Sequence, residues 1–109
     1  IRMMAGPVDY TQGAMQNAVR GGFYPVYSNP MSQGTRCRQM AEYVVFNSPL
    51  NMLCDSPTRY MKEQECTDFI SSVPTVWDET RSLDCKLSHY IHIARRKGDV
   101  WYVGGMNDW

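Results

Sequence analysis

The sequence YIHIARRKGDVWYVGGM, residues 90–106, carries the strongest fold signal of this chain. Two runs rich in β-branched and aromatic residues flank Lys97-Gly98-Asp99, a turn sequence that contains glycine. This pattern predicts a β-hairpin with strands at Tyr90–Arg96 and Val100–Met106. The pair Gly104-Gly105 falls inside the second strand, where glycine is typical of a β-bulge.

Upstream of the hairpin, a period of two predicts a further strand at Val76–Leu83. Before it, Ser48-Pro49 and Ser56-Pro57 are each typical of an N-cap followed by proline at the first helical position. They predict short helices at Pro49–Cys54 and Pro57–Met61, and a third is expected at Gln64–Ser71. Residues 49–74 are therefore interpreted as a helical connector.

A stronger helix is predicted over residues 32–47. Ser32 is expected to begin it, and Asn47-Ser48-Pro49 to end it, because a residue before proline is pushed out of the helical region. The residues at the spacing of one buried helical face are Cys37, Met40, Ala41, Val44 and Val45. Those expected on the opposite, polar side are Arg36, Arg38, Gln39 and Glu42.

The first 34 residues differ from the rest, because they hold eight of the fourteen Gly and Pro residues together with Phe23, Tyr24 and Tyr27. This composition predicts a long loop packed against something larger. At its start, GPVDYTQGAM, residues 6–15, is typical of a short buried strand that delivers Asp9 and Tyr10 to the loop.

The bulk properties set limits on the function. With 109 residues the chain is at most one ordinary domain. Eleven basic and eleven acidic side chains cancel, which argues against nucleic acid or an anionic membrane as a partner. No apolar run approaches the ~20 residues that cross a bilayer. The chain begins at Ile1 and stops at Trp109, and both ends are interpreted as cut.

No complete catalytic site is found among the polar residues. Adjacent residues on a strand face opposite ways, so Asp78-Glu79 is interpreted as structural rather than as an acid/base pair. The spacing of His89 and His92 does not suit metal binding from a strand. The acidic residues near the start of a short helix are explained by the helix dipole, namely Glu63, Glu65 and Asp68.

Cysteines and tryptophans give two further candidates. The chain has no C-x-x-C pair, so zinc is not expected, and free thiols packed as small hydrophobes are favoured over disulfides for Cys37, Cys54, Cys66 and Cys85. The side chains that could stack on sugar rings are Trp77, Trp101 and Trp109, although aromatics on strands are more typical of core or cross-strand partners.

Four stretches together resemble the C-terminal part of glycoside hydrolase family 97. They are AGPVDYTQGAM (5–15), MSQGTRCRQMAEYVVFNSPLNMLCDSP (31–57), ECTDFISSVPTVWDET (65–80) and YIHIARRKGDVWYVGGMNDW (90–109). The resemblance implies a calcium-dependent α-glucosidase or α-galactosidase, periplasmic or secreted, that acts on α-linked oligosaccharides by an inverting or a retaining mechanism.

The resemblance also implies an α/β architecture. Residues 1–48 would be the last β-strand (5–10), loop (11–31) and helix of a (β/α)8 barrel, completed by the remainder of that barrel. Residues 49–74 would be a helical connector, and residues 75–109 the start of a C-terminal antiparallel β domain. Active sites of such barrels lie at the C-terminal ends of the strands.

By the same resemblance, the catalytic and calcium-binding glutamates precede Ile1, so none is assigned here. Asp9 and Tyr10 match a motif at the barrel mouth and are expected to have a substrate-side or supporting role. The sequence departs from the family at Gln12, where a proline is expected, and at Cys85, Ser88 and His89. The alternative is a small non-catalytic carbohydrate-binding or structural β module.

Overall fold

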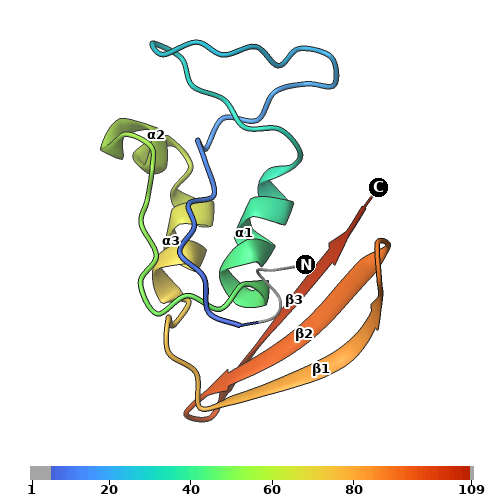
Figure 1. The fold of residues 1–109 in the computed structure, drawn as a ribbon. Coiled ribbons are helices and arrows are strands. Elements are labelled where there is room, and N and C mark those ends of the chain that lie inside the picture. Colours follow the sequence, from blue (N-terminus) through green and yellow to red (C-terminus); the bar gives the residue numbers. More distant parts are fainter. Residues whose placement is uncertain (1–5, 109) are drawn as a thin grey trace.

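The computed structural model describes residues 6–108. The elements follow the order α1 (Arg36–Val45), α2 (Pro57–Lys62), α3 (Gln64–Ser72), β1 (Glu79–Lys86), β2 (Tyr90–Lys97) and β3 (Val100–Asn107). The helices lie on one face of the sheet, and a loop before α1 projects beyond them (Figure 1). Within the described range, no helix has the length and apolar character to cross a membrane.

The predicted hairpin is confirmed. Strands β2 and β3 pair antiparallel in unbroken register, from Tyr90 opposite Asn107 to Lys97 opposite Val100. Gly98 in the turn adopts φ +58°, a left-handed conformation that glycine adopts without strain. Strand β1 pairs antiparallel with β2, which gives a three-stranded sheet of order β1-β2-β3.

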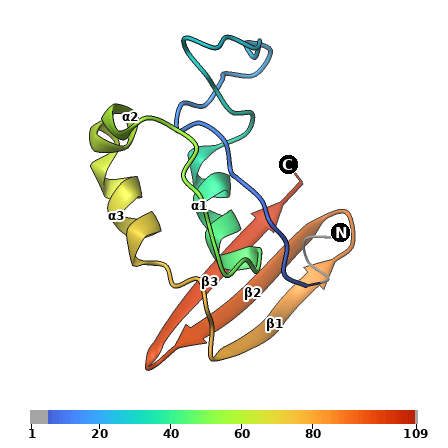
Figure 2. The same ribbon diagram turned by 60° about the vertical axis from the view of Figure 1, so that its left-hand side comes forward.

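The bulge expected at Gly104-Gly105 is a wrong prediction, because both glycines pair regularly with β2. The register shift lies instead in β1, between Ser82 and Asp84. Gly104 has a packing role: a Cβ atom built on it would lie 2.9 Å from Val45 Cγ2 and 3.0 Å from Val44 Cβ. The absence of a side chain there lets α1 lie directly on β3 (Figure 2).

Helix α1 begins later than predicted. Thr35 is its N-cap and accepts a hydrogen bond from Arg38 N over 3.2 Å. Ser32 cannot serve as the cap, because its backbone and hydroxyl are bonded to residues 14–18 of the loop. The helix also ends earlier than Asn47, with Phe46 as its C-cap.

The two sides of α1 are less distinct than the pattern indicated. Val44 and Val45 are fully buried, as predicted, but Gln39 and Glu42 are buried as well and Cys37 is exposed. The reason is an extended segment, residues 8–15, that packs along the polar side of the helix and covers it. The periodicity of apolar residues predicts one buried face of a helix. It cannot show that a second segment covers the polar face as well.

The connector contains two helices instead of three. The predicted helix at Pro57–Met61 is found as α2, with Ser56 as N-cap, and the one at Gln64–Ser71 is found as α3. Residues 49–54 form no helix. The Ser48 hydroxyl donates to Leu50 O over 2.8 Å, a local side-chain bond that competes with helix formation.

The strand predicted at Val76–Leu83 starts at Glu79 instead. Trp77 leaves the strand path and packs against a small core between the helices and the sheet. The buried residues of this core are Tyr43, Val44 and Val73, with Ile70, Trp77 and Tyr102 packed against it. Residues from α1, α3 and β3 therefore share one apolar cluster.

Candidate functional site

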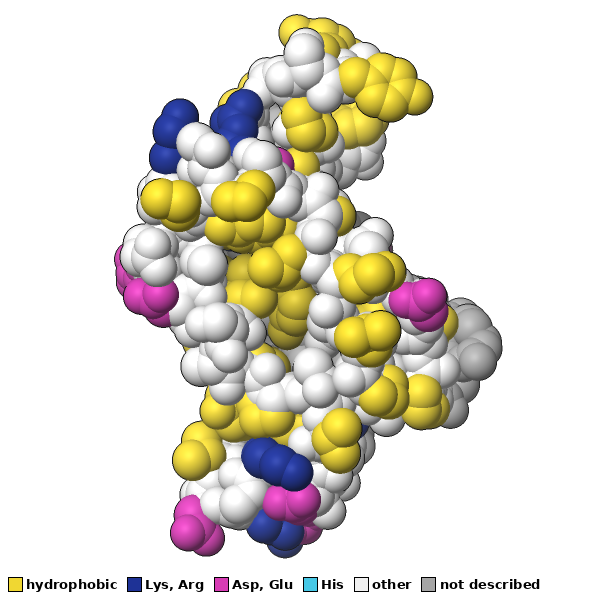
Figure 3. Space-filling view, turned by 90° about the vertical axis from the view of Figure 1, so that its left-hand side faces the viewer, with side chains coloured by type: hydrophobic (Ala, Val, Ile, Leu, Met, Phe, Trp, Pro, Cys, Tyr) yellow, Lys and Arg dark blue, Asp and Glu magenta, His cyan; other side chains and the backbone are white. Residues whose placement is uncertain are grey.

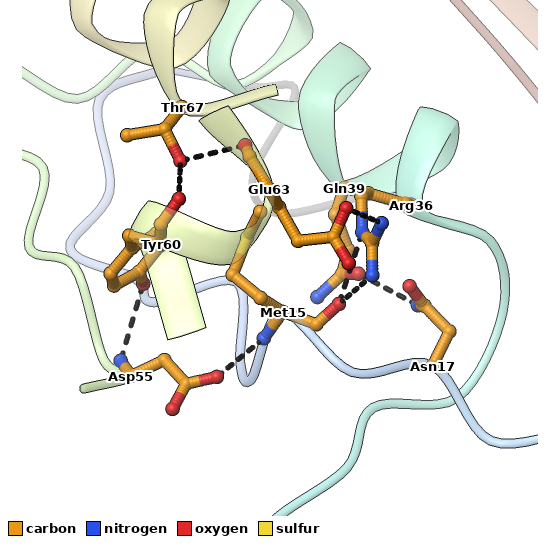
Figure 4. Close-up of polar contacts among 8 residues, drawn as sticks. All are labelled: Met15, Asn17, Arg36, Gln39, Asp55, Tyr60, Glu63 and Thr67. Atoms are coloured by element: carbon orange, nitrogen blue, oxygen red, sulfur yellow. Dashed lines mark hydrogen bonds and ion pairs between the residues drawn. The ribbon is translucent and has the colours of Figure 1, made fainter. Parts of the chain in front are cut away.

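A polar network fixes the start of the projecting loop to the N-terminal half of α1 (Figure 4). Arg36 donates to the carbonyl oxygen of Met15 from Nε over 3.1 Å and from Nη2 over 2.7 Å. Gln39 Nε2 donates to Ala14 O over 2.9 Å, while its Oε1 accepts from Asn17 Nδ2 over 2.7 Å. Two side chains of one helix thus hold three residues at the start of the loop, Ala14, Met15 and Asn17.

The connector holds the same stretch from the other side. Asp55 Oδ2 accepts from Met15 N over 2.8 Å, and the Tyr60 hydroxyl accepts from Asp55 N over 3.2 Å. Glu63 completes the network through its ion pair with Arg36, with 2.7 Å between Oε2 and Nη1. The loop start is therefore clamped between α1 and the α2–α3 corner.

Arg59 of α2 joins the two limbs of the loop. Its Nη1 donates to Gln16 Oε1 over 2.8 Å, and its Nη2 donates to Asn29 Oδ1 over 2.6 Å. Ser32 adds backbone bonds across the base, with its N–H donating to Gln16 O and its carbonyl accepting from Ala18 N. The base of the loop is consequently closed, and residues 19–28 extend from it.

The space beside this network is a small hollow of about 160 Å³, lined by Met15, Gln16, Arg36, Arg59, Lys62 and Glu63. All three guanidinium nitrogens of Arg36, and Nη1 and Nη2 of Arg59, are already engaged with protein acceptors. The arrangement therefore positions the loop rather than performing chemistry of its own.

Asp9 and Tyr10 lie on the extended segment near the other end of α1. The Tyr10 hydroxyl donates to Glu42 O over 3.1 Å, and its ring meets Phe46 edge-on with centroids 5.3 Å apart. Burial, with a contribution from Glu42, raises the pKa of Tyr10 to about 12. Asp9 is exposed, and within residues 6–108 no hydrogen bond or ion pair engages its carboxylate.

Gln12, which stands where the family resemblance predicts a proline, is poorly accommodated in the structure. Both polar atoms of the Gln12 side-chain amide are buried without a hydrogen-bond partner among the described residues. Its backbone carbonyl accepts a bond of 3.3 Å from Gln39 Nε2, so the backbone path is held by α1.

The structural interpretation of Asp78 and Glu79 is confirmed. Asp78 Oδ2 accepts from Gly98 N over 2.8 Å, which ties the start of β1 to the hairpin turn. Glu79 pairs with Arg81 over 2.6 Å and with Arg96 over 3.2 Å. Each carboxylate is engaged with its own partners, and these interactions lower the pKa of both.

The other polar candidates are dispersed. His92 stacks on Tyr90, with ring centroids 5.3 Å apart. Among residues 6–108 no three His, Cys, Asp or Glu side chains are grouped so that they could hold a metal ion. The four cysteines are free thiols, but Cys37, Cys54 and Cys85 are exposed, so the prediction that they pack as small hydrophobes is wrong for these three.

Both tryptophans of the described residues have ring contacts with other side chains. Trp77 packs edge-on against Tyr102, with centroids 5.4 Å apart. Trp101 carries the guanidinium groups of Arg81 and Arg96 over its ring, at 5.1 and 5.9 Å from the centroid. This agrees with the interpretation as core and cross-strand partners, while Trp109 lies outside the described residues.

Comparison with known proteins gives the family. The family model described as "Glycosyl-hydrolase 97 C-terminal, oligomerisation" matches residues 76–109. Over its whole length the chain is 67% identical to a retaining alpha-galactosidase of Bacteroides thetaiotaomicron. The structure matches a glycoside hydrolase family 97 enzyme from Pseudoalteromonas sp. strain K8 with a TM-score of 0.78, at 32% identity over 98% of this chain.

The chain belongs to glycoside hydrolase family 97. The resemblance seen in the four quoted stretches is thereby confirmed, and the three helices with a three-stranded antiparallel sheet are a family 97 fold. The chain spans 16% of the Bacteroides relative, and 17% of the Pseudoalteromonas enzyme, which is also known in complexes with acarbose and with panose.

More distant relatives agree with this placement. A probable retaining alpha-galactosidase of Streptomyces bingchenggensis is 26% identical over 104 residues, which are 95% of this chain and 15% of that protein. The crystal structure of a beta-arabinopyranosidase matches with a TM-score of 0.65 and 34% identity over 72% of this chain and 13% of that one.

Proposed function

We propose that the whole protein containing this chain is a retaining α-galactosidase. The observation that carries the proposal is 67% identity, across all 109 residues, with a relative of that name. The family 97 enzyme studied with acarbose and panose is only 32% identical, so an α-galactoside is favoured over an α-glucoside as substrate.

Residues 1–48 are proposed to form the last strand, loop and helix of a (β/α)8 barrel. In support, residues 8–15 run antiparallel to α1: Val8 N bonds to Asn47 O beyond the helix C-terminus, while Met15 lies at Arg36. This is the path of a strand followed by its return helix. Residues 6–10 form no strand here, and the pairing partners of such a strand would be other barrel strands.

The same proposal gives the projecting loop a position. It joins the segment that contains the proposed strand to the start of α1. The loop therefore lies at the C-terminal end of that strand. Barrel enzymes bind substrate at that end. Asp9 would then lie deeper, where the terminal sugar is held, with Tyr10 supporting the backbone through Glu42 and Phe46.

Retaining hydrolysis needs two carboxyl groups about 5–5.5 Å apart, one as nucleophile and one as acid and base. No such engaged pair is found among residues 6–108, so we assign both to the part of the protein outside this chain. The described residues do not fit calcium either, since they offer no group of three ligands. The calcium implied by the family is proposed to bind elsewhere in the whole protein, which we expect in the periplasm or outside the cell.

The proposal is tested with the whole protein on α-galactosyl and α-glucosyl substrates. We expect α-galactoside cleavage, with NMR showing the α-anomer as first product, and loss of activity on chelation that calcium reverses. Asp9→Asn should lower kcat/KM, whereas Asp99→Asn, in the hairpin turn, should not. Exclusive α-glucoside cleavage, or a β-anomer as first product, would contradict the assignment.

The sheet suggests a second role. Residues 76–109 match a family segment described as serving oligomerisation, and the face of the sheet away from the helices is uncovered. Val103 on that face is 66% exposed. We propose that the sheet takes part in self-association of the whole protein, and light scattering of wild type and Val103→Arg should show a smaller assembly for the variant.

A further inference from the structure

We propose that the rings of Phe23, Tyr24 and Tyr27 form a stacking platform for the sugar on the leaving-group side of an α-galactosidic bond. The inference rests on the proposed function, because the bond and its position come from there. What it adds is a binding surface in this chain and a ligand class for it.

The loop presents three exposed aromatic side chains close together in the sequence. Their relative exposures are 44% for Phe23, 61% for Tyr24 and 107% for Tyr27. Trp101, at 41%, is exposed to a similar degree as Phe23, but it lies on the sheet and its ring contacts two guanidinium groups. Hydrophobic side chains gather on the end of the molecule that the loop forms (Figure 3). Large rings held in water without a function are unfavourable, so this end is expected to contact a ligand or another surface.

The backbone that presents the rings is held in place. Gly22 N donates to Val19 O over 2.8 Å, closing one turn, and Asn29 N donates to Val26 O over 3.2 Å, closing another. Gly21 takes φ +77°, which glycine permits in the first turn. The Asn29 side chain is bonded to Arg59, so the rings extend from a fixed base and less conformational freedom is lost on binding.

The composition of the loop indicates a neutral ligand. Between residues 18 and 30 the only charged side chain is Arg20. A pyranose ring is uncharged and presents C–H groups on one face, which match the face of an aromatic ring, while the tyrosine hydroxyls can bond to sugar hydroxyls. An acidic or phosphorylated ligand would be expected to meet more than one basic residue.

The position of the loop distinguishes the sugar it would contact. Asp9 lies toward the C-terminal end of α1, and the loop lies beyond its N-terminal end (Figure 1). In the proposed barrel, the terminal galactose would enter toward Asp9 and the next sugar would remain near the rim. The platform therefore predicts an effect on substrates that have a second sugar and none on those that lack it.

The test compares α-galactosyl fluoride, whose leaving group has no ring, with raffinose, using the whole protein. Tyr27→Ala should lower kcat/KM for raffinose about tenfold, mainly through KM, a loss of about 1.4 kcal/mol. The value for the fluoride should stay within about twofold. Tyr27→Phe keeps the ring and loses only the hydroxyl, so its loss on raffinose should be smaller than that of Tyr27→Ala. The control Leu87→Ala removes a side chain that is 71% exposed and should stay near wild type on both substrates.

Equal losses on both substrates, or no loss on either, would overturn the platform. A change of oligomeric state in Tyr27→Ala would do the same, because it would assign the loop to a second copy. If the wild type cleaves neither substrate, the α-galactosidase proposal fails. Calorimetry then decides the platform, which survives only if raffinose binds the wild type and not Tyr27→Ala.

Discussion

Arg95 of β2 caps the C-terminus of α1 by donating from Nε to Val44 O over 2.6 Å. Its Nη2 donates to Val45 O over 3.0 Å, and its Nη1 donates to Thr80 Oγ1 over 2.8 Å. The last carbonyl groups of a helix have no hydrogen-bond donor within the helix, and here a side chain from a strand is the donor. Arg95 is 7% exposed, and burial lowers its pKa.

Replacing Arg95 with methionine should destabilise the domain. Two buried carbonyl oxygens would lose a charged donor, and we expect the free energy of unfolding to fall by about 2–4 kcal/mol. Arg95→Lys should keep only part of this free energy, since one lysine ammonium cannot reach all three acceptors that the planar guanidinium group contacts. Thermal unfolding of the whole protein gives the comparison, with the exposed Arg81→Met as control; equal effects at both positions would contradict the capping role.

Gly104→Ala should also destabilise the contact between α1 and β3. The added Cβ would lie 2.9 Å from Val45 Cγ2, and overpacking of this kind costs about 1–3 kcal/mol. Val45→Ala opens space at the same point, so the double variant should lose less stability than the two single changes summed. If the losses of unfolding free energy measured in denaturant were strictly additive, the two positions would not be in steric contact.

Glu42 gives a prediction on pH. Its side chain is 8% exposed, and burial raises its pKa above the ordinary value, opposed by Arg38. Because the folded state then binds the proton more tightly than the unfolded state, Glu42 destabilises the fold at neutral pH, and this penalty fades as the pH falls through the raised pKa.

Glu42→Gln should therefore raise the melting temperature at pH 7 and change it little near pH 4. The ion pair that is lost is weak, about 0–1 kcal/mol, because the Arg38 side chain is 49% exposed. Glu65→Gln, at an exposed position of α3, is the control. A lower melting temperature of Glu42→Gln at pH 7 would mean that the pair with Arg38 outweighs the burial of the carboxylate.

Arg36→Met should loosen the loop. The change removes both bonds to Met15 O and the ion pair with Glu63, which close the base on the α1 side. The loop has one trypsin site, Arg20, and we expect cleavage there to be about tenfold faster, since proteolysis follows local opening. The control is Arg38→Met, two residues further along α1, which makes no contact with the loop network and should leave the cleavage rate unchanged.

The predictable part of the fold is the part whose signals are local. The hairpin at 90–106 follows from β-forming residues on both sides of Gly98, and α2 from Ser56 followed by Pro57. The burial of Gln39 and Glu42 could not be predicted, because it depends on a covering segment some 30 residues earlier in the chain. The position of Gly104 against Val45 is long-range in the same sense.

The candidate site shows the same division. The sequence indicated a long aromatic loop packed against something larger, but gave no reason to separate Tyr27 from Trp77 and Trp101 as a sugar-stacking residue. That separation comes from exposure, which depends on what Arg81, Arg96 and Tyr102 cover. The loop anchors could not be predicted either, because Arg36 and Arg59 bond to residues 21 to 43 positions away.

The contact of α1 with β3 bears on how such enzymes can evolve. A recombination event that joined residues 76–109 to an unrelated upstream segment would leave Arg95 without its two carbonyls and Gly104 facing an empty gap. Conversely, a new helix could not settle on β3 unless it brought residues shaped like Val44 and Val45. The sheet and the helix are therefore expected to be inherited together, and natural swaps of the terminal domain should have their crossover points before residue 36.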